Sequence, residues 1–304
     1  MALGISTACL YPMAMEDSLQ TLIDSGFREF EIFINTYSEM EPEFLTMLEE
    51  KLKPQGCRVK SLHPFTSGFE SYLLFSNYER RFQDGASFYR RYFEMARRLG
   101  AEVLVIHGDR SFEKSGLNDR EYYDRFGILS RIAREYGVTL AQENVNAFRS
   151  QDCGFIRNMR EYLKEDASFV LDVKQAVRSG RDPYEMCEAM GKNLVHIHIN
   201  DNRPGRDCLL PGRGEMDYAR LLSILRENHY RGISLVEVYR KDLLRFPSWQ
   251  TLTAFFNPLA LSPALDKFSC GERNCVLYYN YSNAFAFIVK LIFVTRFIKG
   301  GKEF

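Results

Sequence analysis

The stretch VHIHIND, residues 195–201, holds two of the five histidines in this chain of 304 residues. His196 and His198 alternate with branched apolar residues, which is the pattern of a buried parallel strand whose successive side chains point to opposite faces. Imidazole is a frequent metal ligand and also exchanges protons near neutral pH. The sequence therefore predicts chemistry on one face of this strand.

Reactive side chains also end the neighbouring predicted strands. The last inward-facing residue of each strand from the third to the eighth is a carboxylate or an imidazole: His63, His107, Glu143, Asp172, His198 and Glu237. A single such residue often has a structural role, for example in capping a turn. Six in phase on consecutive strands indicate a common site, because independent structural roles would not share one register.

The elements that must position these residues alternate along most of the chain. Short apolar runs predict eight strands, at 3–7, 29–34, 58–63, 102–107, 138–144, 169–173, 194–200 and 233–238. Amphipathic segments between them predict helices, the clearest at 15–26, 42–56, 88–100, 122–137 and 217–232. Strict alternation favours a parallel sheet covered by helices, and eight units predict an α/β fold of the (β/α)₈ TIM barrel type.

A doubly wound open sheet is the alternative fold. It would normally carry a glycine-rich phosphate loop after the first strand, and the segment STACLYP that follows it here contains no glycine. We therefore expect a barrel over residues 1–259, with an eighth helix at 247–259. Residues 260–304 are rich in Phe, Tyr and Cys without a clear period, and they are interpreted as an atypical C-terminal extension of unknown role.

Composition argues against several function classes. Forty basic residues balance forty acidic ones, so no global charge favours nucleic acid or an anionic membrane as partner. The most apolar late stretch, 284–298, contains Lys290 and Arg296 and is shorter than the roughly 20 residues that span a bilayer. Seven scattered cysteines without a CxxC pair are typical of a reducing compartment. With no recognisable signal peptide, a cytoplasmic protein is predicted.

Four of the six residues at the strand ends lie on consecutive strands, which are about 4.8 Å apart in a sheet. We expect them to converge on one cation as metal ligands: Glu143, Asp172, His198 and Glu237. Three carboxylates and one imidazole suit a divalent ion such as Mn²⁺, Mg²⁺, Co²⁺ or Zn²⁺. His196, one step deeper on the same face, is expected to support the ligands or the core.

The ordered motifs VIHGD, QENVN, LDVKQA, HIHINDN, PGRGEMDY and LVEVY resemble the xylose isomerase-like TIM-barrel superfamily over about residues 3–245. Within it they are most similar to the sugar phosphate isomerases and epimerases, which include ketose 3-epimerases and inosose-pathway enzymes. The resemblance implies one divalent metal on the same four ligands. It also implies that Glu143 and Glu237 act as acid and base on opposite faces of the substrate.

This chemistry predicts a metal-dependent sugar or sugar phosphate isomerase or epimerase. A bound cation polarises the carbonyl, and a glutamate then removes the adjacent proton to give an enediolate. His63, His107 and Gln175 are expected to hold substrate hydroxyls. Arg206 is preferred for a phosphate or hydroxyl among four cations on the loops after strands six and seven, the others being Lys174, Arg203 and Arg213.

Other functions stay open at this point. Apurinic endonucleases of the same superfamily use three zinc ions, and His63 and His107 match two of their ligands. Gln175 replaces a further histidine ligand of those nucleases, and no histidine lies between Asp201 and Tyr218. An inosose-type dehydratase and a non-catalytic sugar-binding barrel are further alternatives. The expected partner is a small sugar, and homo-oligomers are compatible with the sequence.

Overall fold

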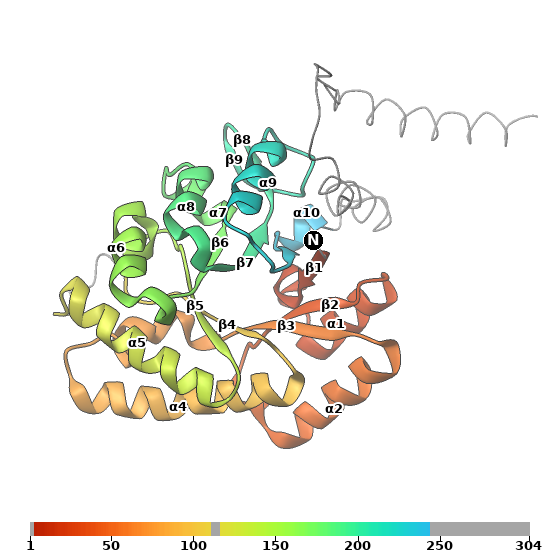
Figure 1. The fold of residues 1–304 in the computed structure, drawn as a ribbon. Helices are drawn as coiled ribbons and strands as arrows, with labels where there is room; N and C mark the ends of the chain where they lie inside the picture. Colours follow the sequence, from red (N-terminus) through yellow and green to blue (C-terminus); the bar gives the residue numbers. More distant parts are fainter. Residues whose placement is uncertain (1–2, 111–115, 244–304) are drawn as a thin grey trace, which may run out of the picture. The chain divides into compact units, whose positions relative to one another are not determined.

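A closed barrel of eight parallel strands forms the centre of the protein (Figure 1). The computed structural model describes residues 3–110 and 116–243. Around the barrel the strands follow the order β1, β10, β7, β6, β5, β4, β3, β2. Their bounds are β1 Leu3–Ser6, β2 Glu29–Phe33, β3 Arg58–His63, β4 Val103–Ile106, β5 Thr139–Glu143, β6 Phe169–Asp172, β7 Leu194–Ile199 and β10 Ser234–Val236.

Helices connect the strands and surround them on the outside (Figure 1). The α-helices are α1 Met15–Asp24, α2 Pro42–Leu52, α3 Glu70–Leu73, α4 Glu79–Leu99, α5 Asp119–Glu135, α6 Cys153–Leu163, α7 Val173–Arg178, α8 Pro183–Met190, α9 Tyr218–Glu227 and α10 Arg240–Leu243. Short 3₁₀ turns are Thr7–Leu10, Tyr37–Met40, Lys53–Gln55, Phe65–Phe69, Arg149–Gln151, Lys164–Asp166 and Gly191–Asn193. The predicted (β/α)₈ fold is confirmed.

Two apolar layers hold the barrel together. The larger one lies between strands and helices and includes Ile197 and Ile199 of β7. The smaller one is a separate cluster contributed by three neighbouring strands, formed by Val103, Val105, Ala141 and Val170. Because side chains alternate along a strand, the residues between the helix-facing ones of β7 point into the barrel, as expected for His196 and His198.

Two predicted helices differ in extent from the observed ones. Helix α4 begins at Glu79, well before the predicted start at residue 88. Helix α9 ends at Glu227 rather than near 232, because His229 already has a left-handed backbone, with φ of 54°. Gly232 lies beyond the end of this helix and has a different role. A Cβ there would lie 2.3 Å from the carbonyl oxygen of Val195, so glycine permits close approach to β7.

The segment predicted as a loop between Asp201 and Tyr218 contains an antiparallel hairpin. Strand β8 (Asp201–Arg203) pairs with β9 (Arg206–Leu209), and Arg203 lies opposite Arg206. The turn residues are therefore Pro204 and Gly205, a dipeptide typical of turns. Strands of three and four residues are too short to show a clear period, which explains why the hairpin was missed.

The carboxylate of Asp201 organises the loop that follows the hairpin. It accepts hydrogen bonds from the backbone N–H groups of Gly212 and Met216, at 2.8 and 3.0 Å. Gly212 has φ of 80°, and a Cβ on Gly214 would lie 2.3 Å from the carbonyl oxygen of Asn202. Both glycines therefore shape the loop.

Asp217 caps α9, since its side chain accepts a hydrogen bond from the Arg220 N–H at the start of the helix. The predicted eighth helix at 247–259 and the extension at 260–304 lie outside the described residues. Within 3–110 and 116–243, no helix combines the length and the apolar character needed to cross a bilayer.

We predict that Gly214→Ala destabilises the protein by about 1–3 kcal/mol, because the added methyl group forces the loop away from the hairpin backbone. Urea unfolding measures the change. Gly68→Ala is the matched control, since its Cβ would meet no atom closer than 4.0 Å. Equal stability of the two variants would show that the loop has room to move.

Candidate metal centre at the barrel mouth

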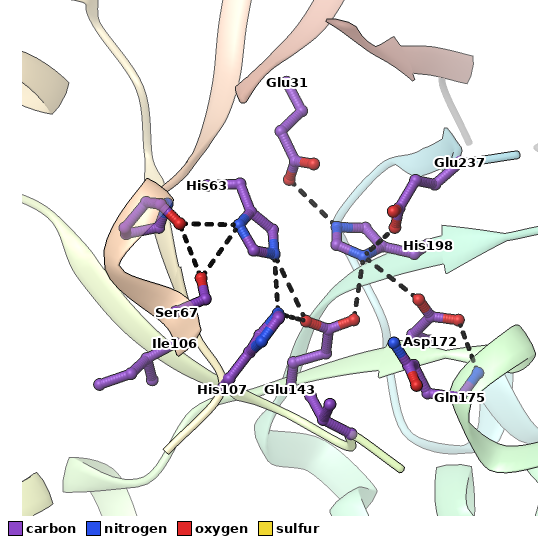
Figure 2. A network of polar contacts seen from close by, with 12 residues as sticks. Glu31, His63, Ser67, Ile106, His107, Glu143, Asp172, Gln175, His198 and Glu237 are labelled. Atoms are coloured by element: carbon purple, nitrogen blue, oxygen red, sulfur yellow. Dashed lines mark hydrogen bonds and ion pairs between the residues drawn. The ribbon is translucent and has the colours of Figure 1, made fainter. Parts of the chain in front are cut away.

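Four side chains from neighbouring strands converge at the carboxyl end of the barrel (Figure 2). Each offers one ligand atom, and these atoms all lie within 4.8 Å of one another: Glu143, Asp172, His198 and Glu237. Asp172 lies opposite His198 in the strand register, and Glu143 is level with Val170, one inward step lower. The structure thus brings together the four residues proposed from the sequence as ligands.

One nitrogen of His198 faces the three carboxylates. Its Nδ1 lies 2.9 Å from Glu237 Oε2, 3.5 Å from Glu143 Oε1 and 3.9 Å from Asp172 Oδ2. Among the described residues, Nδ1 has no hydrogen-bond partner of acceptable geometry, and neither do the buried atoms Glu143 Oε2 and Asp172 Oδ2. The two carboxylate oxygens have ion-pair contacts instead, Glu143 Oε2 with His107 and Asp172 Oδ2 with Lys174. Buried polar atoms that make no hydrogen bond are rare in native proteins, so this arrangement fits a bound cation.

The other nitrogen of His198 is held by Glu31 on β2. Glu31 Oε2 lies 3.0 Å from His198 Nε2 and accepts a hydrogen bond of 2.7 Å from Ser61 Oγ. A proton shared between Nε2 and this carboxylate leaves Nδ1 free to donate its lone pair. The buried carboxylate of Glu31 is therefore paired with His198. His196 lies beneath, with Nε2 3.1 Å from the same serine hydroxyl.

Burial and charge perturb these groups strongly. Burial by itself raises the pKa of Glu237, but the charges of Lys174 and His198 outweigh it and lower the pKa to about 2. Burial likewise disfavours a charged His198, yet Glu31 and Glu237 hold the pKa of His198 well above its usual range. The pKa of Asp172 is raised by burial, which Lys174 offsets only in part. Carboxylates and cations therefore stabilise one another here.

Lys174 is not on a loop, where its place in the sequence predicts it. It lies in the first turn of α7, with only 7% of its side chain exposed. Its Nζ is 3.1 Å from Glu237 Oε1 and 3.3 Å from Asp172 Oδ2. The reason is local, because α7 begins directly after β6, and Asp172 caps it by accepting from the Gln175 N–H at 3.0 Å.

His63 and His107 form a second group that shares Glu143 (Figure 2). Their Nε2 atoms are 3.0 Å apart, and Glu143 Oε2 lies 2.9 Å from His107 Nε2 and 3.6 Å from His63 Nε2. Burial lowers the pKa of His63, but the hydrogen bond to Glu143 and the charge of Glu31 raise it above its usual value. Both histidines thus contact a proposed ligand directly.

The other two residues expected to bind substrate have protein partners. Gln175 Oε1 accepts a hydrogen bond of 3.2 Å from the Asn146 N–H, which ties α7 to the segment after β5. Arg206 Nη2 donates to Asp242 Oδ1 at 2.8 Å, and 40% of the arginine side chain is exposed. Neither residue is part of the cavity at the mouth, so their roles as substrate contacts stay predictions.

An open cavity of about 490 Å³ adjoins the four converging side chains. Glu237 and Lys174 contribute to its wall, whereas Glu143, with 2% of its side chain exposed, does not. The full lining is Ala8, Tyr11, Phe33, Asn35, Phe65, Lys174, Glu237, Val238, Tyr239 and Arg240. The lining therefore combines apolar and aromatic side chains with charged ones.

Comparisons with known proteins agree with this architecture. Inosose dehydratase of Clostridium botulinum (strain Alaska E43 / Type E3) is 20% identical over 265 residues, which cover 76% of this chain and 84% of that protein. The crystal structure of a D-tagatose 3-epimerase-like protein has a TM-score of 0.68 at 20% identity, covering 86% of this chain and all of that one.

The IOLI protein, solved with a bound zinc atom, has a TM-score of 0.67 at 17% identity, over 83% of this chain and 94% of that one. Structural likeness at these identities shows a common fold. In addition, residues 19–258 match the family described as xylose isomerase-like TIM barrel. The resemblance drawn from the motifs is thereby confirmed, and the chain belongs to the xylose isomerase-like TIM barrel family.

Proposed function

We propose that this protein is a divalent-metal-dependent isomerase or epimerase of a sugar or sugar phosphate, which transfers a proton through glutamate side chains. The observation that carries the proposal is the convergence of the four ligand atoms within 4.8 Å at the wall of an open cavity. Enzymes acting on sugars with similar folds, including the D-tagatose 3-epimerase-like protein, support the substrate class.

One divalent cation would be held by the three carboxylates and His198 Nδ1, where it supplies Lewis-acid polarisation of a substrate carbonyl. The chemistry of the donors fits Mn²⁺, Mg²⁺, Co²⁺ or Zn²⁺. The zinc atom in the similarly folded IOLI protein supports a metal in this family of folds. Glu31 would keep His198 in the form that can bind the ion, because it accepts the proton on Nε2.

The two glutamates have the properties that proton transfer requires. Glu237 lines the cavity, and its low pKa keeps it a carboxylate, the form that accepts a proton from the carbon beside a carbonyl. Burial opposes ionisation of Glu143, but His107 and its neighbours hold the pKa of Glu143 well below its usual range. In an epimerase, a proton returned from the other face would pass to carbon through Glu143, supplied by the imidazole of His107, whose Nε2 lies 2.9 Å from Glu143 Oε2. His63 and His107 would hold substrate hydroxyls.

We predict that Glu143→Gln and Glu237→Gln each reduce turnover by about 10²–10⁴-fold, because glutamine cannot exchange a proton at carbon. The measurement follows the C1 and C3 protons of a panel of ketoses by NMR in D₂O, with Mg²⁺-loaded protein. Epimerisation, isomerisation and elimination of water give different products, so the same spectra distinguish an epimerase from an inosose-type dehydratase.

Glu227→Gln on the exposed surface of α9 is the matched control and should retain full activity. Metal content and thermal unfolding of each variant separate a loss of chemistry from a loss of metal or fold. Near wild-type exchange in Glu143→Gln or Glu237→Gln would refute the assigned roles. Incision of abasic DNA by the wild-type protein would instead favour a nuclease.

A second prediction concerns Glu31. We expect Glu31→Gln to weaken divalent metal binding by about 10–100-fold, since the amide cannot accept the Nε2 proton as strongly as the carboxylate does. Titration calorimetry with Mn²⁺ measures the affinity.

Glu29→Gln is the control for this experiment because Glu29 lies on the same strand and pairs with Arg58 instead. It should leave metal affinity unchanged. If Glu31→Gln bound Mn²⁺ as tightly as the wild type, the orienting role of Glu31 would be wrong.

A further inference from the structure

Lys174 presents a buried positive charge to the cavity, which is unusual unless the charge is used. Its side chain is more than nine-tenths buried, and its ion pairs are with Glu237 and Asp172, two of the proposed metal ligands. An ammonium group has three N–H donors in tetrahedral directions. Two carboxylates therefore leave one donor, and Lys174 is itself part of the cavity wall.

If the carboxylate of Glu237 binds the metal ion, the charged side chains that remain in the cavity lining are all positive. The remaining charged lining residues are Lys174 and Arg240. Tyr239 stands beside them, and its ring centroid lies 5.9 Å from Lys174 Nζ and 5.7 Å from Lys241 Nζ. Among the described residues, no acidic side chain forms an ion pair with Arg240 or Lys241.

Two other cationic side chains near the cavity are already paired with carboxylates that are not proposed metal ligands. Arg178 also lies against the Tyr239 ring, at 5.3 Å, but its guanidinium pairs with Asp207. Arg206, the cation favoured by the sequence, pairs with Asp242. Aromatic residues also line the cavity, where they can pack against the carbon skeleton of a sugar: Tyr11, Phe33 and Phe65.

We propose that Lys174, aided by Arg240, forms an anion subsite beside the metal centre, so that the substrate is a sugar carrying a carboxylate or a phosphate group. This inference rests on the proposed function for the reaction, and it narrows the substrate class. A charge-assisted hydrogen bond from a desolvated ammonium is among the stronger polar contacts in proteins. Lys174 is thus a specificity-determining residue, distinct from the ligands and from the groups that move the proton.

The test compares three ketose probes that differ in one substituent: D-fructose, D-fructose 6-phosphate and D-fructuronate. Binding to the full-length, Mg²⁺-loaded protein is measured by titration calorimetry, which does not depend on turnover. We expect at least one anionic probe to bind about tenfold or more tightly than D-fructose. Whichever of the two anionic probes binds more tightly shows whether the subsite prefers a phosphate or a carboxylate group.

Lys174→Met should abolish this preference while affinity for D-fructose changes little. Arg240→Met should reduce the preference for the anionic probe by about two- to fivefold. Because Arg240 is exposed, this variant can be used if Lys174→Met fails to fold. Lys60→Met is the matched control, since Lys60 lies on β3 and pairs with Glu102. It should keep the full preference.

Three results would overturn the inference. The first is equal affinity of the wild type for all three probes, and the second is a preference that survives Lys174→Met. The third is a wild type that binds no Mg²⁺ or Mn²⁺ while Lys174→Met does, because the ammonium would then take the place of the cation. By contrast, an anion preference without proton exchange on any ketose would refute the proposed reaction and leave the subsite standing.

Discussion

An excess of carboxylates inside a closed barrel is the constraint on which the rest of this site depends. Glu31, Glu143, Asp172 and Glu237 gather at one end, and Lys174 is the permanent cation among them. Burying ionised groups without partners is costly. The remaining balance must come from protons on the imidazoles or from a bound cation. The convergence of ligand atoms that make no hydrogen bond of acceptable geometry fits the second solution.

The barrel makes this concentration of charge tolerable because it fixes each group rigidly. Parallel pairing of β5, β6, β7 and β10 sets the ligands at staggered heights, so side chains of different length reach one point. The apolar clusters on both sides of the strands hold them in place. Glu31 reaches His198 across the barrel interior from β2, which couples distant strands through one imidazole.

In the proposed function, the groups that react with the substrate and the groups that select it come from different parts of the barrel. The strand ends supply groups that can hold a metal and exchange protons, and such groups suit many reactions at a carbon beside a carbonyl. The short helix α7 and the segment after β10 supply Lys174, Tyr239 and Arg240, which line the cavity and which we propose select the substrate. Such a division would let barrels of one fold act on different substrates by changes in these segments alone.

The sequence by itself determined those features of the protein that follow from the regular spacing of apolar residues along each strand or helix. Alternation along each strand predicted the eight barrel strands to within a few residues and put Glu143, Asp172, His198 and Glu237 in phase. Neighbouring strands of a barrel follow one another in the sequence. Knowing which residues face inward was therefore enough to predict that these four side chains meet.

Contacts between elements that are far apart in the sequence were decided only by the tertiary structure. The inward position of Lys174 and the pairing of Arg206 with Asp242 depend on where each short segment lies over the barrel. A long side chain at the start of a helix can point to solvent or into the mouth with the same local pattern. Its direction is set by the charges it meets there, and these come from strands whose positions only the folded barrel defines.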